Sequence, residues 1–143
     1  MILVSKCLTG ACCRYDGGSK PDAGVMALIA MGLAVPVCPE ELGGLKSPRL
    51  PAELQAPAED VIEGRGRVIL KDGTDVTEQF IKGAAAALDI AKACGAKRAI
   101  LKAKSPSCGY GLVYDGSFTG RLKEGSGLAA AMLKANGLEI ETV

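Results

Sequence analysis

Residues 84–109 read AAAALDIAKACGAKRAILKAKSPSCG, and this stretch decides the fold. Its alanine-rich start favours a helix, which we expect to end near Cys94 with Gly95 as the stop signal. The apolar residues 99–101 follow at once and predict a buried strand within residues 98–102. The strand then enters a loop in which Cys108 lies among Ser, Pro and Gly residues. The stretch therefore predicts a helix, a core strand and a thiol-bearing loop in succession.

The same alternation extends to both ends of the chain. Short apolar strands are also predicted at residues 2–4, 33–37 and 138–143. Helices are predicted from Pro21-Asp22 to Gly32, from Asp75 to about Cys94, and from Ser126 to near Gly137. Strands that alternate with helices predict an α/β fold with a mainly parallel, Rossmann-like sheet flanked by helices. We expect one domain, residues 1–143, with its site at the carboxyl ends of the strands.

Three local patterns add detail between these elements. Asp75 and Glu78 resemble a capping box, and Ser126 is the expected cap of the last helix. Residues 61–70 hold two apolar runs around Gly64-Arg65-Gly66, which is typical of a small hairpin. Residues 43–57 hold three prolines and a pair of glycines, which predicts a long irregular segment.

Composition excludes several classes of function. The 17 Lys and Arg residues nearly balance the 16 Asp and Glu residues, so a dedicated nucleic-acid binder is not expected. The absence of His excludes Cys/His zinc patterns and imidazole acid–base catalysis. Proton transfer must therefore fall to carboxylates, Lys, Tyr, Cys or water.

The start of the chain and its cysteines indicate a compartment. No secretory leader pattern follows Met1, and no apolar run approaches the ~20 residues of a membrane span. We therefore expect a cytoplasmic protein without a membrane partner. In a reducing compartment, the six Cys residues indicate metal binding, catalysis or burial rather than a disulfide framework.

Three cysteines occupy equivalent places in the predicted fold. Cys7 and Cys108 follow two of the predicted core strands, and Cys38 ends another. Because the carboxyl ends of parallel strands gather at one edge of a sheet, we expect the three thiols to converge. Such soft ligands suit either zinc or an iron–sulfur cluster, and buried cysteines that only fill the core are the alternative. The candidates for a fourth zinc ligand are Cys12, Cys13 and Glu40.

A series of motifs covers nearly the whole chain. The motifs are SKCLTG at 5–10, CRYDGG at 13–18, VCPEELGGL at 37–45 with Pro48-Arg49 and Pro51-Ala52-Glu53, KSPSCG at 104–109, and Tyr114-Asp115-Gly116 before Phe118-Thr119-Gly120. With them the sequence resembles a small bacterial family, long described as a domain of unknown function, whose characterised type is a thiouracil desulfidase.

The resemblance implies a 4Fe-4S cluster that is held by three cysteines, here Cys7, Cys38 and Cys108, and that leaves one iron open. It implies that this iron takes the sulfur of a thiolated pyrimidine, so that the cluster carries an extra sulfide for a time. The net reaction is then a non-redox hydrolysis, in which 2-thiouracil or 4-thiouracil and water give uracil and sulfide. The residues that match the catalytic positions are Glu40, beside the cluster, and Ser105, a neighbour of substrate or cluster.

Other residues in the motifs allow two interpretations each. Cys13 is either a spare thiol near the cluster or a buried loop residue, and the second is favoured. Arg14, Asp16 and Arg49 either bind the substrate or tie loops together, and we favour the loops. Glu53 is interpreted as a cap or an ion-pair partner in preference to a catalytic residue. The residues interpreted as a solvated basic face are Lys97, Arg98, Lys102 and Lys104.

The expected ligand is a small thiolated pyrimidine rather than tRNA. The charge is nearly neutral and only 3% of the residues are aromatic, whereas nucleic-acid platforms need both cations and aromatic rings. Two other functions share the three thiols: a non-catalytic carrier of a cluster or of sulfide, which would not need Glu40, and a zinc-stabilised binding module.

Overall fold

The computed structural model describes residues 1–143, and a four-stranded sheet lies at its centre. In spatial order the strands are β2 (Ala34–Val37), β1 (Ile2–Ser5), β5 (Arg98–Leu101) and β8 (Glu139–Thr142). All three pairings are parallel, and Leu3 lies level with Val35 and Ala99 in its two neighbours. The predicted core strands and their parallel sheet are therefore confirmed. Pro36 lies in an edge strand, where a missing N–H donor is tolerated.

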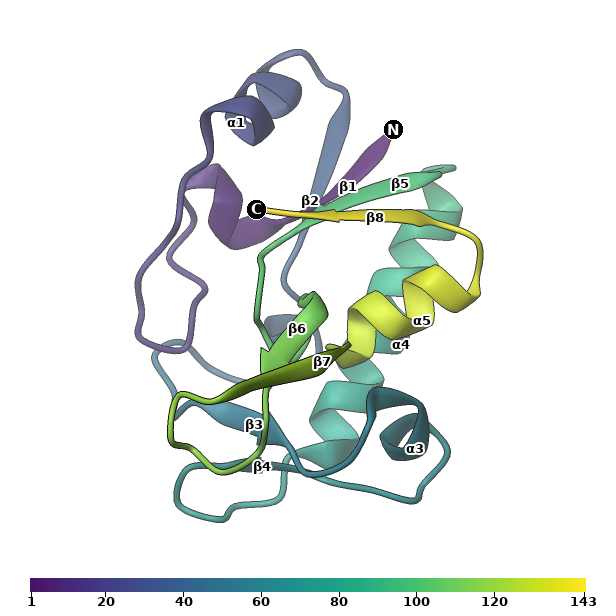
Figure 1. Cartoon of the computed structure of the whole chain (residues 1–143). Coiled ribbons are helices and arrows are strands. Elements are labelled where there is room, and N and C mark those ends of the chain that lie inside the picture. The colour runs from purple at the N-terminus through teal and green to yellow at the C-terminus, as the bar shows by residue number, and fades with distance from the viewer.

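Helices cover both faces of this sheet (Figure 1). α1 (Ala23–Ala30) packs on one face and shares a buried cluster with β1 and β5. α4 (Thr77–Ala93) and α5 (Leu128–Ala135) cover the other face and share a second cluster with the same strands. The Asp22 side chain caps α1 by accepting the backbone N–H of Val25 at 2.9 Å, as the predicted helix start requires. The α/β class is confirmed.

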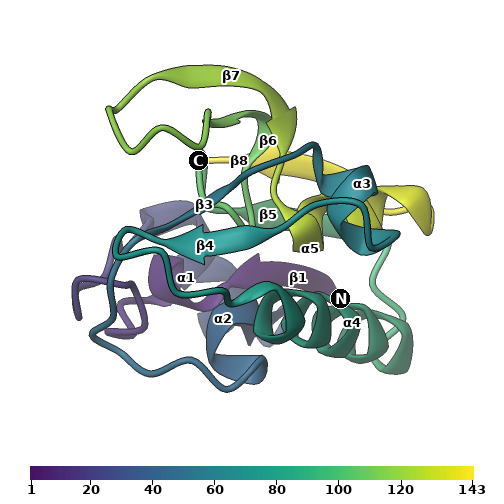
Figure 2. The same ribbon diagram turned by 90° about the horizontal axis from the view of Figure 1, so that it is seen from below.

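Two antiparallel ribbons extend the molecule beyond the central sheet. The first pairs β3 (Ala52–Leu54) with β4 (Val68–Leu70), and the second pairs β6 (Tyr110–Tyr114) with β7 (Leu122–Ser126). Both ribbons share a buried cluster with α4 and α5, and this cluster includes Phe80. In Figure 2 the β3–β4 ribbon lies between α4 and the β6–β7 ribbon.

The short helix α2 (Pro39–Leu42) follows β2 and lies against α4 at very close range. A Cβ atom on Gly43 would lie 1.9 Å from the carbonyl oxygen of Gln79. One on Gly83 would lie 1.8 Å from the carbonyl oxygen of Pro39. Both positions therefore require glycine, because the two helix backbones touch there. This contact fixes the position of α2, whose first turn belongs to the site described below.

The predictions for residues 43–70 are partly wrong. The first apolar run of the predicted hairpin lies in helix α3 (Ala58–Ile62), which is followed by Gly64 at φ 83°. The second run is β4, which pairs with β3 from the segment that was predicted to be irregular. Val61 and Val68 enter the same buried cluster, so short apolar runs alone could not separate this helix from a strand.

The predicted capping box at the start of α4 is also wrong. The N-cap residue is Val76, and the Asp75 side chain accepts the backbone N–H of Thr77 at 2.9 Å. Asp75 therefore stabilises a turn before the helix without the reciprocal contact from Glu78 that a capping box needs. The predicted helix itself is confirmed, since α4 ends one residue before Cys94.

The last helix has a different cap from the one predicted. Ser126 is the final residue of β7, and Gly127 is the N-cap of α5. A Cβ atom at Gly127 would lie 2.4 Å from the Ser107 carbonyl carbon, so close packing requires glycine there. The β6–β7 ribbon was not predicted, because Val113 is its one buried residue and period-2 alternation of buried residues is absent.

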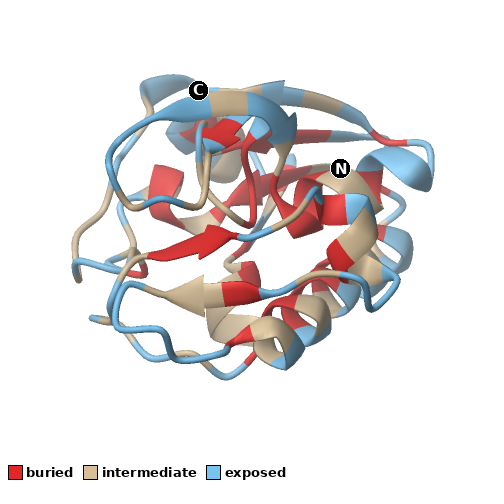
Figure 3. Cartoon of the chain, turned by 60° about the horizontal axis from the view of Figure 1, so that its bottom comes forward, coloured by how far each residue is buried: buried red, intermediate tan, exposed pale blue.

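Buried residues lie mainly in the central strands and on the inner sides of the helices (Figure 3). No helix in the chain has both the length and the apolar character that crossing a bilayer demands.

Candidate metal centre

A cavity of about 400 Å³ opens at the carboxyl ends of β1, β2 and β5. Ser5 and Val37, the last residues of β1 and β2, line it, as does Lys102 directly after β5. The position agrees with the site that the sheet topology predicts. The five candidate residues from the sequence all line the cavity: Cys7, Cys38, Cys108, Glu40 and Ser105. Their roles in binding and catalysis stay predictions.

The three thiols come from three different loops. Cys7 lies in the short 3-10 helix η1 (Lys6–Thr9) directly after β1, and Cys38 is the N-cap residue of α2. Cys108 lies in the connection from β5 to β6. Cys7 and Cys108 are buried, Cys38 is half-buried, and all of the chain's thiols are free. Parallel strand ends therefore bring together thiols that lie far apart in the sequence.

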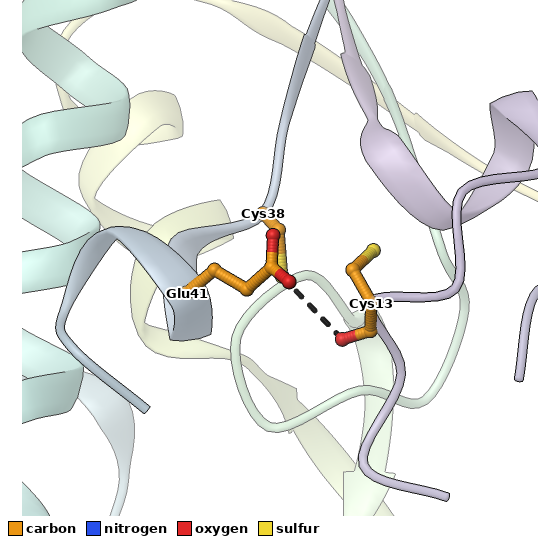
Figure 4. A group of neighbouring side chains, drawn as sticks. All are labelled: Cys13, Cys38 and Glu41. Carbon is orange, nitrogen blue, oxygen red and sulfur yellow. Dashed lines mark hydrogen bonds between the residues drawn. The ribbon is translucent and has the colours of Figure 1, made fainter. Parts of the chain in front are cut away.

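A fourth thiol, that of Cys13, joins this group. The ligand atoms of Cys13, Cys38 and Glu41 lie within 4.8 Å of one another, as Figure 4 shows. The Cys38 thiol donates to the backbone carbonyl of Cys13 at 3.8 Å, and Glu41 Oε1 accepts from Lys6 Nζ at 3.0 Å. Cys13 is 2% exposed, which agrees with the favoured interpretation as a buried loop residue, and it also lines the cavity. The sequence offered a position of Cys13 near the other thiols only as one alternative, whereas the contribution of Glu41 was not predicted.

Contacts between the thiols and burial set their protonation. The contact with Cys13 lowers the pKa of Cys7 and strongly raises that of Cys38, which burial raises further. For Cys13 the contact with Cys38 lowers the pKa, but the contact with Cys7 and burial outweigh it, and the pKa is about 11. Burial raises the pKa of Cys108 to about 12. Because metals bind thiolates, loading this site must displace protons.

Glu40 is the carboxylate closest in sequence to the thiols, and side chains hold both of its oxygens. Arg49 Nε donates to Oε1 at 3.0 Å, and the two side chains are 8% and 13% exposed. Ser107 Oγ donates to Oε2 at 3.1 Å. Arg49 also donates to the backbone carbonyl of Cys13 at 3.1 Å. These bonds hold both oxygens of the carboxyl group and fix its direction.

The sequence therefore predicts the roles of Arg49, Ser105 and Ser107 only in part. Arg49 does tie loops together, as favoured, but its main partner is Glu40. Ser105 Oγ accepts the backbone N–H groups of Ser107 and Cys108, each at 3.1 Å, and so shapes the loop around that thiol. The serine that donates to Glu40 is Ser107 rather than Ser105, and Ser107 is 2% exposed. Its place in the KSPSCG motif was the available signal.

The cavity lining is strongly cationic. Two carboxylates, Glu40 and Glu53, face seven cationic side chains there. These cations are Lys6, Arg14, Lys20, Arg49, Lys71, Lys102 and Lys104. Lys102 and Lys104 belong to this lining: Lys104 is exposed, as the interpretation as a solvated face has it, whereas Lys102 is half-buried. Burial, and then the neighbouring Arg14, lower the pKa of Lys102.

The donor set fits an iron–sulfur cluster. Four thiols line one cavity, and the chain has no His, so the soft ligands that such clusters prefer are the ones present. The two remaining cysteines, Cys12 and Cys94, do not line the cavity, which agrees with their interpretation as bystanders. The Cys13, Cys38 and Glu41 group equally fits a single thiophilic cation by geometry alone.

Comparisons with known proteins point to one family. The model of a family described as 2-thiouracil desulfurase matches residues 2–142. The uncharacterised protein YbbK of Bacillus subtilis (strain 168) is 45% identical over 141 residues, which cover 98% of this chain and 93% of that protein. The solved structure of the [4Fe-4S]-dependent thiouracil desulfidase TudS superposes with a TM-score of 0.88 at 41% identity. That match covers 99% of this chain and 89% of the TudS chain.

Proposed function

The chain belongs to the 2-thiouracil desulfurase family, and on that premise we propose that it is a 4Fe-4S enzyme that replaces the sulfur of a thiolated pyrimidine with oxygen. The observation that carries this proposal is the cavity itself, which is lined by buried and half-buried thiols from three separate segments and by a carboxylate with both oxygens held. The desulfidase domain spans residues 1–143.

Cys7, Cys38 and Cys108 are the proposed ligands of the cluster. They come from three separate elements, so no local sequence spacing limits the size of the group they hold. A cluster held by three thiolates supplies one open iron, a Lewis acid with affinity for sulfur. Cys13 is the remaining thiol of the cavity and stays outside the ligand set, as a neighbour whose backbone carbonyl accepts from the Cys38 thiol.

Glu40 is the proposed acid–base group. Replacing C=S by C=O consumes one water and releases hydrogen sulfide, so the atoms balance without any oxidant or reductant. The ionised carboxylate takes a proton from the attacking water and returns it to the departing sulfur. Arg49 and Ser107 hold both oxygens of Glu40 and so fix the direction of the side chain, which supports this role. The reaction is therefore a hydrolysis.

The proposed substrate is a small anionic pyrimidine. The cavity has the size of a small-molecule site, and its lining holds seven cations against two carboxylates. That excess favours an ionised 2- or 4-thiouracil or a thiolated nucleoside monophosphate over a neutral base. Ser105 is a substrate neighbour in this scheme. The free thiols suit a reducing compartment, and we place the enzyme in the cytoplasm on that ground.

The test is turnover by the anaerobically reconstituted protein with 2-thiouracil, 4-thiouracil and 4-thiouridine monophosphate. We expect loss of the thiocarbonyl absorbance, with one sulfide and one oxygenated pyrimidine formed per substrate consumed. A cluster or sulfide carrier would bind sulfide without turnover. A zinc module would hold zinc and no iron in protein isolated without oxygen, so either result contradicts the proposal.

A further inference from the structure

Glu53 is a buried carboxylate that the proposed reaction does not use. It lies in β3, is 8% exposed and lines the cavity. Its Oε1 atom accepts the backbone N–H of Gly116 at 2.9 Å and that of Phe118 at 3.2 Å. Both partners lie in the loop that joins β6 to β7. A buried carboxylate is costly unless donors satisfy it, so these bonds hold β3 and the loop together.

The loop is packed tightly on β3 and adopts an uncommon conformation. A Cβ atom on Gly116 would lie 2.7 Å from the carbonyl oxygen of Leu54, and Gln55 Nε2 donates to the Gly116 carbonyl at 3.0 Å. Phe118 has φ 58°, which is the left-handed region that bulky residues rarely occupy. Such a conformation persists only where neighbouring contacts hold it, and Glu53 provides one at the Phe118 amide itself.

The cavity also collects most of the aromatic side chains. Phe118, Tyr15 and Tyr114 line it, and they are three of the five aromatic residues in the chain. Of the other two, Phe80 is in the core and Tyr110 is exposed outside the cavity. Tyr15 and Tyr114 are exposed, whereas Phe118 is half-buried. Phe118 is therefore the most sheltered aromatic surface that a flat ligand can meet.

We propose that Phe118 is the stacking platform for the pyrimidine ring of the substrate, and that Glu53 is the positioning residue that holds it there. The inference rests on the proposed function, because it assumes a pyrimidine substrate. Stacking on an aromatic ring tolerates any base and binds substrate and product alike. Phe118 therefore contributes to binding of the ring, while Glu40 and the thiols deal with its sulfur.

The first test compares Phe118→Leu, Phe118→Tyr and the control Tyr110→Leu in cluster-loaded protein. We expect Phe118→Leu to raise both KM and the Kd for uracil by about tenfold, with kcat nearly unchanged, because stacking contributes equally before and in the transition state. Phe118→Tyr keeps an aromatic face and should retain wild-type affinity. Tyr110→Leu lies outside the cavity and should change neither constant.

A second variant separates binding from folding. Glycine adopts φ 58° without strain, so Phe118→Gly should fold with little loss of Tm yet bind uracil as weakly as Phe118→Leu. For Glu53, the amide oxygen of Gln can still accept both N–H groups, whereas Ala cannot. We expect Glu53→Gln to stay near wild type and Glu53→Ala to raise KM about as much as Phe118→Leu.

The outcomes separate the two proposals. Normal sulfide release with unchanged uracil affinity in both Phe118→Leu and Phe118→Gly would overturn the stacking role alone. A large loss of kcat in Glu53→Gln would overturn the positioning role, because it would make the carboxyl group of Glu53 chemically necessary. A wild-type protein that neither releases sulfide nor binds uracil would contradict the proposed function, and the pyrimidine platform with it.

Discussion

Glu40, on α2, and Glu53, on β3, both line the cavity, but their hydrogen-bond donors differ. The side chains of Arg49 and Ser107 hold Glu40 by one oxygen each, whereas two backbone N–H groups meet a single oxygen of Glu53. Donors that bind a carboxylate from both sides orient it for proton transfer. Where the donors are backbone N–H groups of a turn, the carboxylate instead fixes the conformation of that turn. In the proposed mechanism the same residue type thus has a chemical role at Glu40 and a structural role at Glu53.

We call the first of these regions the thiol wall, which comprises Cys7, Cys38, Cys108 and Glu40, and the second the ribbon wall, which comprises Glu53, Tyr114 and Phe118. The thiol wall follows the ends of the parallel strands. The ribbon wall comes from the two antiparallel ribbons. Variants on the two walls should therefore have different effects on cluster content and on substrate affinity.

The largest effect is expected from the thiols. Cys7→Ala, Cys38→Ala and Cys108→Ala should each abolish cluster retention, because each removes one of three ligands. Anaerobic iron and sulfide analysis with visible absorbance measures this. The control Cys94→Ala removes a thiol outside the cavity and should keep its iron, as should Phe118→Leu on the ribbon wall. A thiol-wall variant with full iron content would remove that residue from the ligand set.

The next effect is expected from the two carboxylates, each changed to its amide. Glu40→Gln should lower kcat by about 100-fold or more while retaining its iron, since it removes the acid–base group. The matched change Glu53→Gln should lower kcat little. Steady-state kinetics on protein of equal iron content compares them. Similar losses of kcat in both variants would contradict the assignment of proton transfer to Glu40 alone.

A smaller effect is expected where α2 meets α4. Gly83→Ala should destabilise the protein by about 1–3 kcal/mol, because the new Cβ atom would lie 1.8 Å from the Pro39 carbonyl oxygen. The better helix propensity of Ala offsets only about 1 kcal/mol of this. Ala85→Gly, at an exposed position of the same helix, provides the reverse change and should cost about 1 kcal/mol. Urea unfolding measures both free energies. A Gly83→Ala protein that is more stable than Ala85→Gly would contradict the close contact between the two helices.

The last effect is confined to alkaline pH. In cluster-free protein the folded pKa values of Cys13 and Cys108, about 11 and about 12, are raised, so the folded state holds these protons more tightly than the unfolded state. Their contribution to stability is present below ~8.5, where unfolded thiols titrate, and is lost as the pH rises toward those folded values. Urea midpoints measured with reductant and chelator should fall over that range, and less so in Cys108→Ser. An equal fall in the variant would contradict the assignment.

The two walls also differ in how far the sequence predicts them. The thiols at 7, 38 and 108 follow apolar strands, and parallel topology alone brings such positions together. Cys13 could be given only as one of several alternatives, because its approach to Cys38 depends on the path of a loop without a periodic pattern. On the ribbon wall, Glu53 and Phe118 are separated by 65 residues. No sequence pattern predicts the exposed β6–β7 ribbon or the positive φ of Phe118.

The central claim is that this cavity exchanges sulfur for the oxygen of water without net redox change. Turnover of 2-thiouracil by reconstituted protein, in water enriched in the heavy oxygen isotope and without any reductant, tests it most directly. The account predicts uracil that carries the heavy isotope at the former thiocarbonyl position, with one sulfide released per uracil and no labelling of uracil added as such. Uracil without the label, or turnover that requires a reductant, would contradict it.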